Sequence, residues 1–319
     1  MPDAAHPFID ARDPTAPPPG LAGAVVALGN FDGLHRGHKG VIARAQALAR
    51  ALQKPCAVLT FEPHPADFFA GRSVIFRLTP PAAKAALLAR LGLNGMITLT
   101  FDAHFAALTA ADFTGDILAR RLGVSAVVAG YDFRFGAARQ GDAEFLRAEG
   151  ARLGFRVEIV ERIVKDEAGS LDAVSSTATR EALERGDLAL ANSLLGRPYF
   201  IEGEVIHGEK RGRDLGFPTA NIALDPSNRL RHGVYAVTLE ARGVVHGGVA
   251  SFGRRPTFDN GPPLLEVFVF DFSGDLYGEM VEVAFHGFLR GEEKFGSIDA
   301  LIAQMNADAA AAREILARE

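Results

Sequence analysis

The stretch Ala27–His38, with the sequence ALGNFDGLHRGH, decides how the first half of the chain is interpreted. It overlaps the end of the apolar run 24–28, whose β-branched residues and abrupt stop at a glycine predict a buried strand. A helical pattern begins at about Lys39 and continues to Gln53. The stretch is therefore predicted to form the turn between a buried strand and a helix.

Two histidines, His35 and His38, stand three residues apart where this helix is expected to begin. The start of a helix leaves backbone N–H groups unpaired and carries a positive partial charge, so it suits a phosphate group. Imidazoles at positions i and i+3 face the same side and can add two more donors. The alternative is an ordinary glycine turn with two surface histidines. The pairing of the histidines and the strand–turn–helix context favour the phosphate site.

Length and composition indicate a globular protein of two domains. The chain has 319 residues, of which 48% are hydrophobic and 23% are charged. Its net charge of −5 argues against non-specific nucleic-acid binding, which needs a basic face. The single cysteine, Cys56, excludes an intramolecular disulfide framework and a cysteine-rich metal site. Because it lies in an apolar run, we expect a buried, inert thiol.

Neither a membrane span nor a secretion signal is predicted. No apolar run reaches the roughly 18 residues that a membrane-spanning helix needs. Residues 1–20 are rich in proline and alanine and lack the basic start and apolar stretch of a signal peptide. We expect these residues to form a disordered leader and the protein to be cytoplasmic.

Strand and helix patterns alternate through the first half of the chain. The predicted strands are residues 24–28, 56–61, 96–101, 126–129 and 156–164, with helical patterns between them. Such alternation predicts a parallel sheet with helices on both faces, and ligands bind such sheets at the carboxyl ends of the strands. The loops after the first, second and fourth strands carry GNFDGLHRGH, FEPHP and GYDFRFG. All three loops are therefore expected at the same edge of the sheet.

The second half of the chain shows a different pattern. Short β-like runs separated by Gly, Pro and Asn turns favour an antiparallel barrel or sandwich. These runs are residues 199–207, 233–239, 244–250, 265–272 and 280–288, and an amphipathic helix from Ser297 to about Ala317 follows them. We place the boundary near Asp187, which gives a leader (1–20), an α/β domain (21–187) and a β domain (188–319).

Three further motifs are ambiguous when they are considered alone. The sequence Ser175-Ser176-Thr177 can be a helix cap, or it can bind phosphate together with Arg180. The stretch GEKRGRDLG (208–216) can be a basic β-turn, and its spacing is not that of a Walker P-loop. Glu266 lies in the apolar run LEVF, so it either faces outward or is functional, since a buried strand rarely keeps an unpaired charge.

Taken together, GNFDGLHRGH, SSTATR (175–180) and GEKRGRDLGFPTAN (208–221) resemble the bacterial bifunctional riboflavin kinase/FAD synthetase family. The resemblance covers roughly residues 24–305. It implies a Rossmann-like nucleotidyltransferase domain with a parallel sheet, followed by an antiparallel β-barrel of the riboflavin kinase type with a closing helix. It also implies two reactions: riboflavin and ATP give FMN, and FMN and ATP give FAD and pyrophosphate.

For the first domain, the resemblance implies an adenylyl transfer that depends on charge neutralisation and alignment more than on acid–base chemistry. His35 and His38 would hold ATP phosphates, and Arg180 would grip the departing pyrophosphate. Asn30 and Asp32 would shape the loop. The residues implied to bind ATP are Gly29, Asn30, Phe31, Asp32, Gly33, Asp132, Ser175, Ser176 and Thr177. The residues implied to receive the flavin are Phe61, His64 and Pro65; for FEPHP the alternative is a rigid proline turn.

For the second domain, the resemblance makes Glu266 the general base that takes a proton from the ribityl 5′-hydroxyl of riboflavin. Thr219 and Asn221 offer hard oxygen ligands for Mg²⁺, which would bridge ATP phosphates. The glycine-rich stretch would bind ATP through Gly208, Lys210, Gly212 and Gly216. Arg254 belongs to a segment that is expected beside the flavin. The implied partners are small-molecule substrates, with no nucleic acid and no membrane; weak self-association is left open.

The chain departs from the family pattern at three places. Ala178 stands where a basic residue is common, Tyr131 where an acidic or polar one is, and Ser251-Phe252 where an Asn-aliphatic pair is usual. A riboflavin kinase with a decayed adenylyltransferase half is therefore an alternative. Two others are a flavin- or nucleotide-binding regulator without turnover, and a first domain that adenylylates pantetheine phosphate or nicotinamide mononucleotide.

Overall fold

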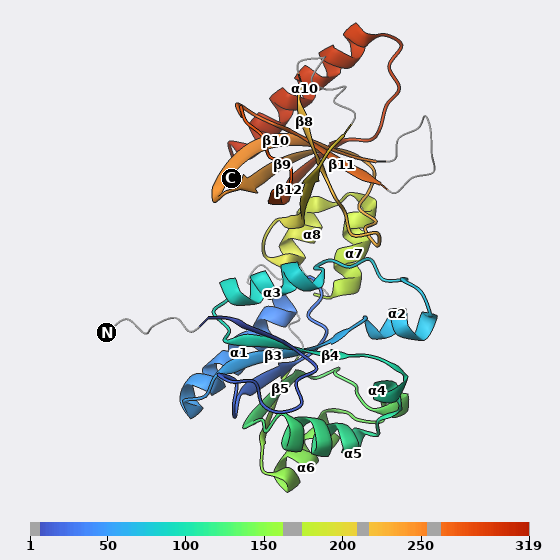
Figure 1. The fold of residues 1–319 in the computed structure, drawn as a ribbon. Coiled ribbons are helices and arrows are strands. Elements are labelled where there is room, and N and C mark those ends of the chain that lie inside the picture. The colour runs from blue at the N-terminus through green and yellow to red at the C-terminus, as the bar shows by residue number, and fades with distance from the viewer. Residues whose placement is uncertain (1–6, 162–173, 209–216, 254–262, 319) are drawn as a thin grey trace, which may run out of the picture. The chain divides into compact units, whose positions relative to one another are not determined.

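The computed structural model describes residues 7–161, 174–208, 217–253 and 263–318 and divides into two compact units (Figure 1). The first unit comprises Met1–Ile75 and Thr79–Val174, and the second comprises Phe76–Leu78 and Ser175–Glu319. This division differs from the boundary expected near Asp187. The helix after Val174 and a three-residue segment from the first half of the chain both pack within the second unit.

The first unit contains a six-stranded sheet in the order β1-β4-β3-β2-β5-β6, with every neighbouring pair parallel. Its strands are β1 (Ile9–Arg12), β2 (Val25–Leu28), β3 (Cys56–Glu62), β4 (Gly95–Thr100), β5 (Ala126–Gly130) and β6 (Arg156–Val160). β2 and β3 are buried at every residue, which explains why they are continuous apolar runs. The five strands predicted from the sequence are present; the one predicted over 156–164 ends at Val160, and residues 162–164 lie outside the described residues.

Strand β1 corrects the prediction of a disordered leader over residues 1–20, of which residues 1–6 lie outside the described residues. Ile9–Arg12 pairs in register with Gly95–Thr98 at the edge of the sheet. The strand can approach this closely because residue 95 is a glycine: a Cβ there would lie 2.5 Å from the carbonyl oxygen of Ile9. The proline-rich composition around this short strand hid it from the sequence analysis.

Helices of the first unit lie on both faces of the sheet. They are α1 (Arg36–Leu52), α2 (Pro65–Ala70), α3 (Pro81–Arg90), α4 (Ala103–Ala107), α5 (Ala110–Asp112), the π-helical η1 (Phe113–Arg121), the 3₁₀-helical η2 (Ala137–Arg139) and α6 (Ala143–Leu153). Figure 1 shows α3 on one side of the sheet and α5 and α6 on the other. The strand order reverses at β2 and β5, which are neighbours at the centre of the sheet. That reversal is where sheets of this kind bind ligands.

The single cysteine lies at the start of β3. Cys56 is buried, and burial raises the pKa of its thiol to about 12. The expectation of a buried cysteine is confirmed, and a raised thiol pKa disfavours the reactive thiolate.

The second unit is built around a closed antiparallel barrel with the strand order β10-β11-β8-β7-β12-β9. Its strands are β7 (Tyr199–Ile206), β8 (Thr219–Ile222), β9 (Gly233–Ala241), β10 (Val244–Gly253), β11 (Leu264–Val269) and β12 (Met280–Arg290). Five of these match the predicted runs, and β8 was missed because it has only four residues, two of them polar. Of the two architectures expected for this half of the chain, the structure has the closed barrel and not the sandwich.

In the described part of the second unit, the barrel is accompanied by the helices α7 (Ser176–Arg185), α8 (Leu188–Leu195) and the closing helix α10 (Ile298–Leu316). α10 is attached to the barrel by an ion pair that is largely shielded from solvent. The guanidinium of Arg290, at the end of β12, donates to both carboxylate oxygens of Asp308 at 2.8 to 3.1 Å.

The segment Phe76–Leu78 is part of the hydrophobic core of the second unit. Phe76 and Leu78 are 1% and 2% exposed, and the Phe76 ring lies edge-on to Tyr199 with 6.2 Å between centroids. The backbone is also held: Arg180 Nε donates to the Phe76 carbonyl at 2.7 Å, and the Arg77 N–H donates to Ser227 Oγ at 3.0 Å. A piece of the first half of the chain thus completes the core of the second unit.

Replacing Phe76 with alanine should lower the free energy of unfolding of the second unit by about 3–5 kcal/mol, because a cavity remains in its core. The chain has no tryptophan, and three of its four tyrosines (Tyr199, Tyr235 and Tyr277) lie in the second unit. Tyrosine fluorescence during urea unfolding therefore reports mainly on that unit. Phe69→Ala is the matched control, since that ring is 72% exposed. An equal shift for the two variants would contradict burial of Phe76.

Candidate active sites

The loop between β2 and α1 adopts a strained backbone. Phe31, Gly33 and Leu34 have φ values of 50°, 84° and 46°, in the left-handed region that favours glycine. Such conformations cost energy at the two non-glycine positions and persist only where the surroundings hold them. The side chains of Phe31 and Leu34 are each 1% exposed, so burial in the core holds the loop from inside.

The two histidines of the loop are brought together as predicted. Their rings stack with 3.6 Å between centroids and 16° between planes. His35 is the N-cap of α1, and its Nδ1 accepts from the N–H of His38 at 3.2 Å. In the neutral ring the proton of His35 is then on Nε2, which is a donor. Gly37 makes room for this arrangement, since a Cβ there would lie 3.1 Å from the His35 ring.

Asp32 and Gly33 are held by Thr79, which lies 47 and 46 residues further along the chain. One carboxylate oxygen of Asp32 accepts from Thr79 N–H at 2.9 Å and from its hydroxyl at 3.2 Å. The Gly33 N–H donates to Thr79 Oγ1 at 2.9 Å. The sequence Thr79-Pro80-Pro81 favours Thr79 as the cap of the following helix, but Pro80 is the N-cap of α3. The buried Asp32 thus ties the loop to the segment that precedes α3.

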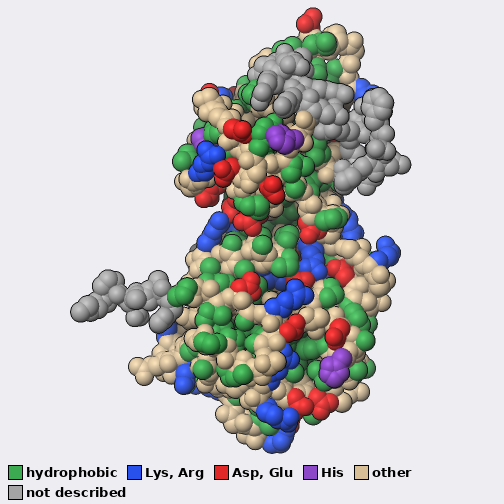
Figure 2. All heavy atoms as spheres, viewed as in Figure 1, with side chains coloured by type: hydrophobic (Ala, Val, Ile, Leu, Met, Phe, Trp, Pro, Cys, Tyr) green, Lys and Arg blue, Asp and Glu red, His purple; other side chains and the backbone are tan. Residues whose placement is uncertain are grey.

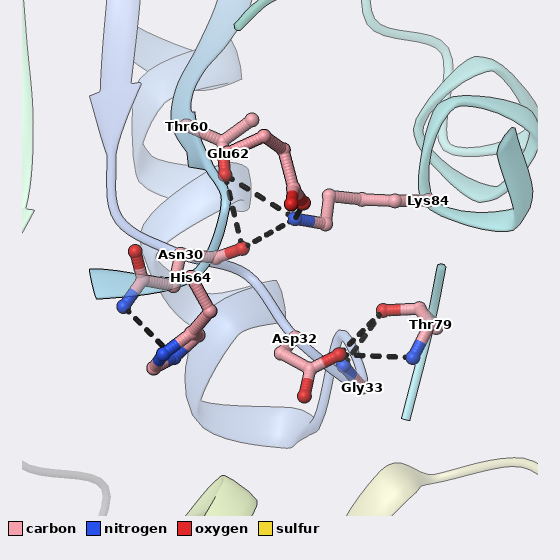
Figure 3. A network of polar contacts seen from close by, with 8 residues as sticks. All are labelled: Asn30, Asp32, Gly33, Thr60, Glu62, His64, Thr79 and Lys84. Atoms are coloured by element: carbon pink, nitrogen blue, oxygen red, sulfur yellow. Dashed lines mark hydrogen bonds and ion pairs between the residues drawn. The ribbon is translucent and has the colours of Figure 1, made fainter. Parts of the chain in front are cut away.

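His64 links the loop after β3 to the loop after β2. Its Nδ1 accepts from Ala66 N–H at 3.2 Å, which makes it the N-cap of α2 with Pro65 in the first turn. Its Nε2 lies 3.3 Å from Nδ2 of Asn30 (Figure 3). The motifs GNFDGLHRGH and FEPHP therefore meet at the carboxyl edge of the sheet, as predicted.

Lys84, on α3, was not identified from the sequence. Its side chain is 4% exposed, and its ammonium donates to the Asn30 carbonyl at 2.9 Å and to Thr60 Oγ1 at 3.3 Å. It also pairs with a carboxylate oxygen of Glu62 at 3.5 Å (Figure 3). A lysine on a helix with an apolar face is normally expected in solvent, so nothing in the sequence singled it out.

The aromatic side chains near the predicted flavin site differ in exposure. Phe61 is buried, and its ring lies 5.4 to 6.4 Å from those of Phe101, Phe105 and Phe113. Phe69, at the end of α2, is exposed and lies edge-on to Phe101. In this structure Phe61 belongs to the core, so its contact with flavin stays a prediction.

The loop after β5 places Asp132 beside the first site. Strands β3, β2 and β5 are consecutive in the sheet and parallel, so the loops at their carboxyl ends share one edge. Asp132 and Tyr131 are both exposed there. The Gly130 Cα is close to this carboxylate, since a Cβ there would lie 3.1 Å from Oδ1 of Asp132.

The second phosphate motif lies at the start of α7, in the second unit. Ser175 is its N-cap, and Oγ accepts from Ala178 N–H at 3.1 Å. The Thr179 hydroxyl donates to the Ser175 carbonyl at 2.9 Å. Arg180 uses Nε to hold the Phe76 carbonyl. The motif therefore acts as a helix cap, and phosphate binding by Ser176, Thr177 and Arg180 stays a prediction.

In the barrel, Glu266 on β11 is paired in register with Asn221 on β8 and with Ser251 on β10. Residues paired in this way project from the same face of the sheet. The neighbours Leu265 and Val267 are fully buried in the barrel, so Glu266 faces outward and is half-buried. Thr219, two residues before Asn221, lies on the same face.

The amide of Asn221 is buried, and its Oδ1 accepts no hydrogen bond from the described residues. Gly208 packs directly against it: a Cβ at that position would lie 2.2 Å from Nδ2 and 2.7 Å from Oδ1. A buried amide oxygen without a donor is costly unless a ligand satisfies it. Hard oxygen donors suit Mg²⁺, so the residues present fit the implied ion.

Several predicted site residues cannot be placed. Lys210, Gly212, Gly216 and Arg254 lie outside the described residues. Within the described part of the chain, no group of three or more His, Cys, Asp or Glu side chains could hold a metal ion. On the face shown in Figure 2, Lys and Arg side chains are interspersed with Asp and Glu.

Two family models match consecutive parts of the chain. One is described as FAD synthetase and matches residues 18–178, and the other is described as riboflavin kinase and matches residues 195–316. The bifunctional riboflavin kinase/FMN adenylyltransferase of Pseudomonas fluorescens is 42% identical over 296 residues, which cover 92% of this chain and 94% of that protein. The chain belongs to this family. The protein of the same name from Escherichia coli K12 is 41% identical over 293 residues, covering 92% of each chain.

A solved structure, titled a macrolide-efflux protein from Streptococcus pneumoniae, has a TM-score of 0.83 and 33% identity. It covers 96% of this chain, and this chain covers 99% of it. Among the residues that the structure describes, no helix is both long and apolar enough to cross a membrane. The bifunctional family and the fold of both units agree with the resemblance seen in the sequence, and the reading as a kinase with a decayed first half is not favoured.

Proposed function

We propose that the barrel unit phosphorylates riboflavin to FMN and that the α/β unit adenylylates FMN to FAD. The chain is a bifunctional transferase of this family, with ATP, riboflavin, FMN and FAD as substrates or products. The observation that carries the assignment of sites is the pairing of Glu266 with Asn221 on one barrel face. The stacked histidines at the start of α1 support the other site in the same way.

In the kinase reaction, Glu266 accepts the proton of the ribityl 5′-hydroxyl. That oxygen attacks the γ-phosphorus of ATP, and ADP leaves. Asn221 Oδ1 and the Thr219 hydroxyl would hold Mg²⁺, which would offset the negative charge of the ATP phosphates. Gly208 lets the chain pass against the Asn221 amide, and Lys210, Gly212, Gly216 and Arg254 are assigned by the resemblance alone.

In the adenylyl transfer, a phosphate oxygen of FMN attacks the α-phosphorus of ATP, and pyrophosphate leaves. His35 and His38 would donate to phosphate oxygens beside the N-terminus of α1, where the positive partial charge of a helix start favours a phosphate. Phe31, Asp32 and Gly33 would fix the backbone of the loop. Gly29, Asn30 and Asp132 would line the nucleotide-binding site. Ser175, Ser176, Thr177 and Arg180 would hold the departing pyrophosphate. His64 and Pro65, with Phe61 behind them, would receive the flavin.

A time course with riboflavin, ATP and Mg²⁺ tests the assignment. FMN should appear first and FAD later, because the product of one reaction is the substrate of the other. Excess EDTA should stop both reactions, and added Mg²⁺ should restore them, since ATP phosphates need a counterion for transfer. FMN that accumulates without FAD would indicate a kinase alone, and flavin binding without ATP consumption would indicate a regulator. Phosphopantetheine or nicotinamide mononucleotide in place of FMN tests the acceptor.

We also propose a cytoplasmic location, because both reactions consume ATP. Weak self-association stays a prediction. Sedimentation at several protein concentrations would measure it.

A further inference from the structure

Lys84 is a buried cation beside the adenylyltransferase site that no motif includes. It projects from the first turn of α3 to the carboxyl ends of β2 and β3 (Figure 3). Its ammonium contacts groups at those two strand ends: the Asn30 carbonyl, the Thr60 hydroxyl and the Glu62 carboxylate. The Thr60 hydroxyl itself donates to the Asn30 carbonyl at 3.1 Å. The carbonyl of Asn30 is thus held by two donors.

A buried ammonium is costly unless it is paired and hydrogen-bonded. Here Glu62, which is also buried, supplies the opposite charge, and the two oxygens at Asn30 and Thr60 supply hydrogen bonds. Apolar residues that pack well in the same place often stabilise a fold at least as much as a buried ion pair. Stability alone therefore does not explain why a lysine occupies this position.

Asn30 is the residue at which the strained histidine loop begins. The left-handed backbone at Phe31 follows directly, and His35 caps α1 five residues after Asn30. Lys84 holds the carbonyl at the start of this loop, and Thr79, five residues before Lys84, holds Asp32 and Gly33 in its middle. The short stretch from Thr79 to Lys84 therefore bonds to the loop at its start, through Lys84, and in its middle, through Thr79.

We propose that Lys84 is a positioning residue for adenylyl transfer: it fixes the Asn30 carbonyl and through it the loop that carries His35 and His38. The inference rests on the proposed role of those histidines in holding ATP phosphates. Lys84 does not touch the substrate itself. It keeps the phosphate donors in place, and a displacement of about 1 Å in such groups can lower a rate about 100-fold.

The first test is Lys84→Met, assayed for the conversion of FMN to FAD. The kcat should fall about 100-fold, because the groups that hold the phosphates lose their alignment. Riboflavin phosphorylation by the same chain should be unchanged and serves as an internal control. Lys54→Met is the matched control: Lys54 is an exposed lysine of the same unit just before β3, at the opposite edge of the sheet. Unchanged FAD formation by Lys84→Met would overturn the proposal.

A second variant separates positioning from stability. In Glu62→Met/Lys84→Met both charges are replaced by apolar side chains of similar length, so the midpoint of urea unfolding followed by circular dichroism should recover toward the wild-type value. We expect kcat to remain low, because the Asn30 carbonyl still lacks its ammonium donor. Recovery of both the midpoint and kcat would show a merely structural role. If the wild-type chain forms no FAD at all, that result contradicts the proposed function. Only a comparison of an active wild-type chain with Lys84→Met tests the role of Lys84.

Discussion

Replacing Glu266 with glutamine should lower FMN formation about 10²–10⁴-fold, the usual contribution of a general base. Glutamine keeps the shape of the side chain and cannot accept the proton of the ribityl hydroxyl. Because Glu266 faces outward from β11 and is paired with Asn221, the substitution adds no volume to the barrel core. The loss should therefore appear in kcat while the fold is retained.

The measurement is the rate of FMN formation from riboflavin and ATP, with FAD formation from supplied FMN as an internal control that should not change. Glu240→Gln is the matched control, since Glu240 is also a half-buried carboxylate on a barrel strand, β9. Normal kinase turnover by Glu266→Gln would show that another group takes the proton.

The second large effect is expected at His38, whose replacement by alanine should lower FAD formation about 10²–10³-fold, as when one preorganised donor is removed from a transition state. His38 is a better choice than His35 for this test. The Nδ1 of His35 caps α1, so its loss would also change the start of the helix.

With riboflavin as the substrate, His38→Ala should convert it to FMN and stop there, so FMN accumulates in the time course. His104→Ala is the control, because His104 is an exposed histidine on α4 of the same unit. If FAD still forms at the wild-type rate, then His38 does not hold ATP phosphates, and the loop has another purpose.

The layout of the first site could be predicted from the sequence because local patterns determine it. Apolar runs of strand length followed by Gly- and Pro-containing loops indicate parallel strands, and the carboxyl ends of such strands share one edge. The i, i+3 spacing of His35 and His38 likewise predicts rings on one side of a helix start, which is where the stacked pair lies.

The contacts that hold this site could not be predicted, because they join residues far apart in the chain. Thr79 resembles a helix cap in the sequence, but its hydroxyl holds Asp32 and Gly33 instead. The sequence context of Lys84 is that of a solvent-facing lysine. In the structure its ammonium instead contacts oxygens of Asn30, Thr60 and Glu62, which lie more than 20 residues away in the chain. Strand β1 was missed for a similar reason, since its order comes from pairing with β4 and not from its composition.

The segment Phe76–Leu78 has a consequence for the modularity of the protein. The chain passes between the two units at three peptide bonds, after Ile75, after Leu78 and after Val174. A fragment that begins at Ser175 would therefore lack two side chains of its own core. A chimaera that takes its second half from a relative would also need the three matching residues in its first half. The two units follow one another along most of the chain, but the core of the second unit also needs three residues from the first half.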